Sequence, residues 1–173
     1  MEERILHRIT IRFRETIESA FEELSALSHR PTSDKPRPGS WAPVEVLGHL
    51  VDSACNNHRR LVLGLMGGKF QFEGYAQDNW VSVQNYVHAD WSYLLQLWRA
   101  YNLHLCHILE HQKEDVLKKH IDIHNFNNFG FGRLDEKEVL TVEVFIDDYI
   151  DHIEHHLKQI LVLFNNDTVE NYD

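Results

Sequence analysis

Apolar residues recur at helical spacing in four long stretches of the chain, and this periodicity predicts four helices. The first stretch runs from about residue 5 to residue 24 and ends before three prolines between positions 31 and 38, which forbid a continuing helix. The second begins after Trp41, places Pro43 in its first turn and reaches about Gly67. Both stretches carry an apolar stripe along one face, as expected for helices packed on a common core.

The third stretch starts behind Asp90, a favourable N-cap residue, and carries apolar side chains as far as Ile108. The fourth opens near Thr141 and continues to about Ile160. Between turn signals the chain contains no run of β-branched residues that alternates as a strand would. We therefore expect an all-α, four-helix bundle formed by one domain that spans residues 1–173.

The connections predicted between these helices, 29–42, 67–89 and 112–140, are longer than antiparallel neighbours need. Long crossovers permit parallel neighbours, as in up-up-down-down arrangements. The last connection contains an Asn-, Phe- and Gly-rich stretch at 125–132. Its aromatic side chains either pack over one end of the bundle or form a lid over a substrate.

Composition narrows the class of protein. With 43% hydrophobic residues the chain can build a core, and its net charge of −10 argues against a protein that tracks nucleic-acid phosphates. Charges interrupt the apolar residues at the N-terminus, which does not read as a signal peptide, and no apolar run is long enough to span a membrane. Two cysteines cannot form a disulfide framework, so we expect a cytoplasmic protein.

The chain has 13 histidines, and three pairs of them are separated by four residues: His107/His111, His120/His124 and His152/His156. On a helix this spacing places two imidazoles on one face, where they can share a metal ion. His152 and His156 lie at the border of the apolar face of the fourth helix, among acidic residues that suit partners for metal-binding imidazoles. The alternative is two half-buried histidines hydrogen-bonded to carboxylates or to the backbone.

The other histidines have simpler interpretations. His107 and His111 lie near the end of the third helix, where they favour a capping role, and helical spacing cannot be assumed at His120 and His124. His58 is expected to be packed and hydrogen-bonded. Four further histidines are expected at the surface or its boundary: His7, His29, His88 and His104. Periodicity gives no reason to single out His49.

Two motifs about a hundred residues apart resemble the DinB/YfiT-like superfamily. They are Glu45-Val-Leu-Gly-His49-Leu-Val-Asp52, preceded by Trp41, and Tyr149-Ile-Asp-His152-Ile-Glu-His-His156-Leu-Lys-Gln-Ile160. The resemblance covers essentially the whole chain and implies an up-up-down-down bundle. One departure from the pattern is Ala42, where a Ser or Thr cap is frequent, at an expected local cost of ~1 kcal/mol.

The resemblance implies a divalent metal, nickel or zinc, held by His49, His152 and His156, and it also implies a homodimer. Relatives include transferases that join low-molecular-weight thiols to electrophiles, as well as proposed hydrolases. Such a metal lowers the pKa of a water or a thiol, so both activities are consistent with one site and a small-molecule substrate. An anionic thiol would need a cation in the pocket, for which Arg59, Arg60 and Arg133 are candidates.

A metal-binding or stress-response module without turnover is the hypothesis from another class. Two other metal sites are excluded by the sequence itself. A carboxylate-bridged di-iron bundle needs Glu-x-x-His pairs, and a zinc peptidase of the usual kind needs His-Glu-x-x-His, and neither pattern occurs. The residues do not identify a general base or a substrate.

Overall fold

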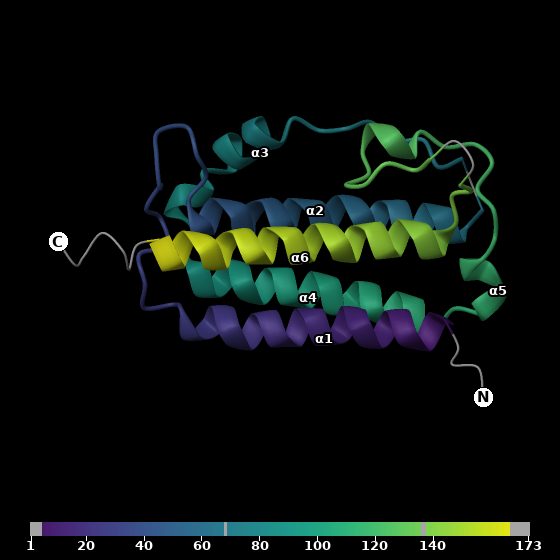
Figure 1. Cartoon of the computed structure of the whole chain (residues 1–173), viewed down its shortest axis with the longest axis horizontal. Helices are drawn as coiled ribbons and strands as arrows, with labels where there is room; N and C mark the ends of the chain where they lie inside the picture. Colours follow the sequence, from purple (N-terminus) through teal and green to yellow (C-terminus); the bar gives the residue numbers. More distant parts are fainter. Residues whose placement is uncertain (1–4, 68, 136–137, 167–173) are drawn as a thin grey trace.

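Four long helices form the body of the protein in a computed structural model that describes residues 5–67, 69–135 and 138–166. They are α1 (Ile5–Ala26), α2 (Pro43–Leu65), α4 (Trp91–Glu110) and α6 (Val142–Asn166), and they lie along one long axis (Figure 1). Each begins and ends within a few residues of the position predicted from periodicity. The all-α, four-helix bundle is confirmed.

Short helical turns occupy the long connections. The segment between α2 and α4 contains α3 (Gln77–Gln84) and the 3-10 turn η1 (Tyr86–His88), and the segment before α6 contains α5 (Glu114–Leu117) and the 3-10 turn η2 (Phe126–Asn128). Within the described residues, extended pairing is limited to two isolated bridges, Phe70 with His124 and His120 with Thr141. None of the described helices combines the length and apolar character needed to cross a membrane.

The order of helix directions differs from the expected one. Arg8 pairs with Glu143 and Arg12 pairs with Glu154, so α1 and α6 run in parallel. In contrast, α4 runs antiparallel to α1, because Arg14 pairs with Glu110 near the end of α4, while Trp91 at its start donates to the carbonyl of Leu24 at 3.1 Å.

The second helix completes the order. His49 faces His156 while Gly64 approaches Val142, so α2 runs antiparallel to α6 and parallel to α4. The directions are therefore up-down-down-up instead of up-up-down-down. The connection between α2 and α4 joins parallel neighbours, as a long crossover permits. The connection between α1 and α2 reverses the direction of the chain despite its length.

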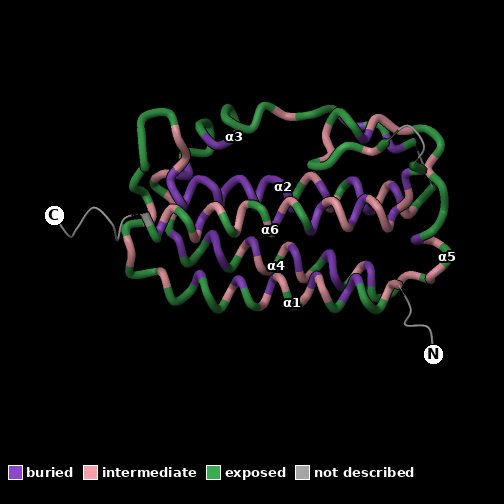
Figure 2. Tube along the Cα trace, viewed as in Figure 1, coloured by how far each residue is buried: buried purple, intermediate pink, exposed green. Residues whose placement is uncertain are grey.

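Helix α2 is the most deeply buried element of the bundle. Every residue from Pro43 to Ala54 is buried, including both faces of the helix (Figure 2). Helices α4 and α6 cover one side of it, and the segment of α3 and η1 covers the other, where Tyr86 packs on Gly48. Polar side chains in this half of α2 are therefore shielded from bulk water.

Helix α4 begins with the expected side-chain cap, whereas α2 begins without one. Asp90 caps α4 by accepting a hydrogen bond from the backbone N–H of Tyr93 at 2.7 Å. At the start of α2, Ala42 has no side-chain acceptor, but its own N–H donates to Glu45 at 2.8 Å. The N–H of Val44 donates to the Thr32 carbonyl, so neighbouring backbone compensates for the missing cap.

Candidate metal centre

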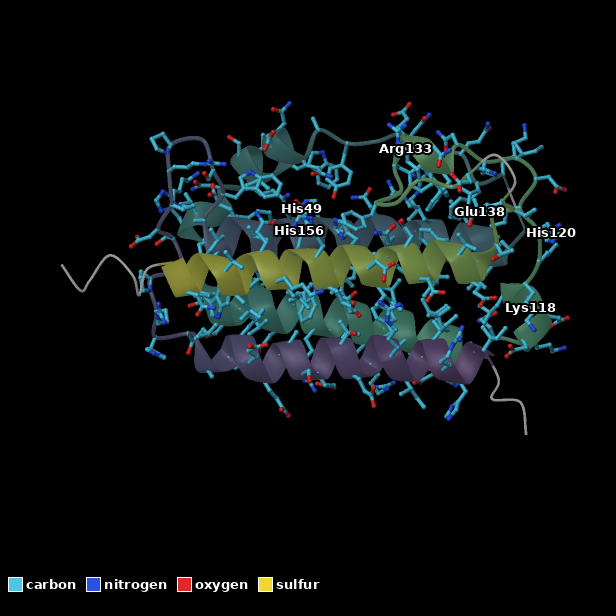
Figure 3. All side chains as sticks on the ribbon, in the orientation of Figure 1. His49, Lys118, His120, Arg133, Glu138 and His156 are labelled. Carbon is cyan, nitrogen blue, oxygen red and sulfur yellow. The ribbon has the colours of Figure 1, made fainter. Side chains whose placement is uncertain are left out.

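Three imidazole rings meet where α2 faces α6. His49 projects from the first half of α2, and His152 and His156 project from successive turns of α6. One ring nitrogen from each lies within 4.8 Å of the other two, and the residues described contain no other group of three or more His, Cys, Asp or Glu placed this way. Figure 3 shows His49 beside His156, with His120 far away at one end of the bundle.

Hydrogen bonds leave the convergent nitrogens available for a cation. His156 Nδ1 lies 2.8 Å from Gln159 Oε1, an acceptor, so we assign the proton to Nδ1 and the lone pair to Nε2. His152 Nδ1 lies 3.4 Å from Ser53 Oγ. The Nε2 atoms of His49 and His152 are 3.3 Å apart. Nitrogens bound at about 2.0–2.1 Å to one tetrahedral zinc are separated by roughly this distance, so this pair is spaced as two ligands of one ion. A nitrogen of His156 lies within 4.8 Å of both, and the three imidazoles together suit a divalent metal.

Burial keeps these rings neutral. Burial, with a smaller contribution from repulsion by neighbouring imidazoles, lowers the pKa of His49 to about 4 and the pKa of His152 to about 2. Burial also lowers the pKa of His156. Neutral imidazole is the form that ligates metals, so at neutral pH the three rings can accept a cation without first releasing protons.

We expect the metal-free protein to lose stability as the pH falls below about 6.5, the pKa of an unfolded histidine. Below that pH the unfolded chain takes up a proton at His49, while the folded chain takes up none until about pH 4. Each such group costs at most about 1.4 kcal/mol per pH unit across this window. The effect is absent above pH 6.5, where both states are neutral.

Urea unfolding with a chelator at pH 7.5, 6.5, 5.5 and 4.5 measures this loss, and His49→Gln is the matched variant. Wild type should lose stability more steeply than the variant between pH 6.5 and 4.5. Buried carboxyls such as Asp148, whose pKa is raised by burial, act in the opposite direction in both proteins and cancel in the comparison. If the free energy of unfolding falls equally with pH in wild type and in His49→Gln, His49 is not buried in its neutral form.

A cavity of about 330 Å³ opens beside the imidazoles. His152 and His156 line it, whereas His49 is fully buried behind them, so access to the three rings is from the α6 side. The remaining walls come from the middle of α2, from α6 and from the two long connections. They include Ser53, Asn57 and Arg60 of α2, and the aromatic residues Tyr75, Phe129 and Phe131.

The Asn-, Phe- and Gly-rich segment packs one aromatic side chain into the core and places others beside the cavity. Phe126 is buried in the core, whereas Phe131 is exposed and its ring centroid lies 5.6 Å from that of His152. The backbone N–H groups of Phe131 and Gly132 donate to Asp148 on α6, which holds the segment at the cavity mouth. One phenylalanine is therefore packed inward while the next ones border the cavity.

The remaining histidines largely follow their sequence interpretation. His111 Nδ1 lies 2.8 Å from the carbonyl of His107 at the end of α4, which confirms the capping role. His58 is half-buried and packs edge-on against the His104 ring. His120 and His124 lie in extended bridges, not on a helix. Four are exposed, as expected for surface positions: His7, His29, His88 and His104.

The acidic residues of α6 do not orient its imidazoles as expected. Asp147, Asp151 and Glu154 converge instead on Arg12 of α1, at 3.6, 2.6 and 3.0 Å. They occupy the face of α6 that packs against α1, while the histidines face α2. Glu45 does not orient an imidazole either, because its carboxylate pairs with Lys35 and accepts a hydrogen bond from the backbone N–H of Ala42.

The actual partners of the imidazoles, Ser53 and Gln159, were missed by sequence reasoning. Gln159 is three residues after its partner His156, so helical spacing alone would place the two side by side. Ser53 contacts His152 from another helix, and no spacing along α2 indicates that contact. Asp52, in contrast, accepts hydrogen bonds from Gln84 and Tyr86 at 2.8 Å each and fastens the α3 segment to α2.

Comparison with known proteins supports the fold. A profile described as the DinB superfamily matches residues 11–160. YfiT from Bacillus subtilis (strain 168) is 27% identical to the chain over 127 residues, which are 73% of this chain and 66%, just under two thirds, of YfiT. The solved structure of YfiT, described as a probable metal-dependent hydrolase with an unusual four-helix bundle topology, superposes with a TM-score of 0.71. That match covers 93% of this chain and 86% of YfiT at 21% identity, and it therefore concerns the fold.

Proposed function

The chain belongs to the DinB superfamily, and from this premise we propose that it is a single-domain, metal-dependent enzyme acting on a small molecule. His49, His152 and His156 would hold the metal. The observation that carries this proposal is the convergence of three neutral imidazoles at the wall of a cavity. A divalent ion held there supplies a Lewis acid that lowers the pKa of a water or a thiol.

We propose hydrolysis as the reaction, in agreement with the description of YfiT. The protein's own contribution is positional. Ser53 and Gln159 fix the planes of two imidazoles, the burial of His49 limits water at the back of the site, and Phe131 borders the open side. A substrate in the cavity would therefore meet the site from the face that His152 and His156 line.

Transfer of a thiol to an electrophile is the second candidate, and one specific observation favours it. Of the three arginines considered as partners for an anionic thiol, Arg60 lines the cavity, while Arg59 and Arg133 are exposed. The same imidazoles would serve either reaction, because lowering the pKa of a thiol and of a water requires the same kind of site.

Assays of the purified protein separate the candidates. Metal content is measured first, with about one nickel or zinc per chain expected. The loaded protein is then offered an ester and amide panel, and a chlorinated aromatic acceptor with and without a low-molecular-weight thiol. Turnover without thiol supports hydrolysis, and turnover only with thiol supports transfer. A fully loaded protein inactive on both panels favours a metal-binding module without turnover.

Removal of the metal is expected to lower the melting temperature without unfolding the protein. The three imidazoles come from only two helices, which also share an apolar core with α1 and α4. A ligand present at 100 times its dissociation constant adds about 2.7 kcal/mol. For a chain of this size that corresponds to roughly 5–10 °C. Circular dichroism with and without chelator measures the shift, and complete unfolding at 25 °C would assign the metal a structural role.

We further propose a homodimer in the cytoplasm. Both cysteines are unpaired, with Cys55 exposed and Cys106 buried, as a reducing compartment allows. Sedimentation of the metal-loaded protein would test the dimer.

A further inference from the structure

Arg60 is a buried cation at the far end of the cavity from the imidazoles. Its side chain lies beneath the Phe129 ring, with the guanidinium carbon 4.2 Å from the ring centroid and 5.9 Å from that of Phe72. The residue is only 6% exposed, and yet it lines the cavity. A guanidinium in this position is held in place by aromatic faces and faces the same space as the metal site.

The guanidinium has no ion-pair partner in the part of the chain that the structure describes. Its hydrogen bond from Nη1 goes to Asn57 Oδ1 at 3.0 Å, a neutral acceptor that can satisfy one of five N–H donors. Asp148 on α6 attracts it from a greater distance, but the oxygens of that carboxylate accept the backbone N–H groups of Phe131 and Gly132.

Such an arrangement is costly to folding. Buried charges are normally paired, because removing a cation from water without a counter-ion costs several kcal/mol. Even two partly exposed arginines of this protein have carboxylate partners: Arg12 meets three carboxylates and Arg99 holds Glu18 with two hydrogen bonds. Arg60 departs from it at the cavity wall, where a ligand could supply the missing anion.

The positions on α2 connect the two ends of the cavity. His49, Ser53, Asn57 and Arg60 are spaced by four, four and three residues, which places them along one face of the helix. From Ser53, which touches His152, to Arg60 is about 10 Å of helix at 1.5 Å per residue. A small molecule lying along this face would contact both the imidazole end and the guanidinium.

We propose that Arg60 binds a carboxylate of the substrate and thereby fixes which end of the molecule reaches the imidazoles. A planar guanidinium pairs with a carboxylate through two parallel hydrogen bonds, and the flanking phenylalanines restrict it to an edge-on approach. A dianionic phosphate fits less well beside Asp148 in a chain with a net charge of −10. The aromatic walls suit an apolar body attached to the carboxylate. This inference rests on the proposed function, whose substrate class it names.

The test compares 3-phenylpropionate with its neutral amide, 3-phenylpropionamide, by NMR titration of the metal-loaded protein. Arg60→Gln removes the cation, and Arg59→Gln is the matched control, because Arg59 is adjacent, exposed and also over Phe72 at 5.9 Å. We expect Arg60→Gln to weaken carboxylate binding by about 10- to 100-fold and to leave amide binding within about twofold. Arg59→Gln should change neither.

If Arg60→Gln and Arg59→Gln weaken carboxylate binding equally, the effect is one of long-range charge and the proposal is overturned. Unchanged carboxylate binding in Arg60→Gln would overturn it as well. Tighter, Arg60-dependent binding of phenylphosphonate would overturn the choice of carboxylate. If Arg60→Gln fails to fold, Arg60→Lys decides. It keeps the charge but loses the two-point contact, so carboxylate binding should weaken at least threefold, and unchanged binding would refute the contact.

The two proposals fail in different ways. Arg60-dependent carboxylate binding by a protein that turns over no ester, amide or thiol substrate would sustain the binding site while refuting the enzyme. The converse result is an active enzyme that Arg60→Gln leaves unaffected and that hydrolyses charged and neutral esters with equal kcat/KM. That result would sustain the enzyme and refute the carboxylate site.

Discussion

Replacing His49 with alanine is expected to abolish both stoichiometric metal retention and turnover. His49 is the one ring of the three that α2 supplies, and without it only the pair on α6 remains to hold a metal. Changing residues that merely orient metal ligands costs 10–100-fold in affinity, so losing a ligand should cost more than about 100-fold. Elemental analysis after dialysis and the hydrolysis assay measure the two effects.

The matched control is His155→Ala. His155 is next to His156 in sequence and its ring centroid lies 5.1 Å from that of His156, but it is exposed at the cavity rim and outside the convergent group. It should retain one metal per chain. A His49→Ala protein that keeps full metal occupancy and full activity would refute the three-histidine site.

Gly48→Ala is expected to destabilise the protein by about 2–4 kcal/mol, although alanine is the better helix former. A Cβ at Gly48 would lie 2.2 Å from Cδ2 of Tyr86, a buried ring on the segment that covers α2. Moving the ring also removes the hydrogen bond from Tyr86 to the buried carboxylate of Asp52. Overpacking costs 1–3 kcal/mol and an unsatisfied buried group a similar amount, against a gain of about 1 kcal/mol in helix propensity.

Urea unfolding of the chelator-treated protein measures this difference, and Gly74→Ala is the control. A Cβ at Gly74 makes only an ordinary contact of 3.6 Å, so that variant should stay within about 0.5 kcal/mol of wild type. Introducing Gly48→Ala into a Tyr86→Ala background should remove the penalty, because the clash has then gone. If Gly48→Ala is as stable as wild type, α3 and η1 do not pack on α2 as described.

Much of the architecture follows from local sequence. Each long helix carries its own apolar stripe and its own start and stop signals, such as Asp90 before α4 and the prolines after α1, and these act within a few residues of chain. The shared face of His152 and His156 is likewise a property of one helix. Short-range spacing also places Gln159 beside His156, whereas the contact of Ser53 with His152 joins two helices.

His49 could not be chosen by the same reasoning. Its position on the helical wheel is unremarkable, and it was singled out only by the family motif. The helix becomes buried on both faces because α3 and η1 cover the side that the bundle leaves open, and that depends on contacts between Tyr86, Gly48 and Asp52. A periodicity argument assumes one buried face, so it fails for a helix with two.

The sequence by itself determined the four helices, their class of fold and, through the family motif, the three histidines. Only the tertiary structure decided the up-down-down-up order, because long connections allow several orders and interhelical packing selects one. It also decided that the acidic residues of α6 serve Arg12, and that Arg60 stands unpaired in the cavity. Charge partners on different helices depend on how the helices are placed, and no spacing along one segment encodes that.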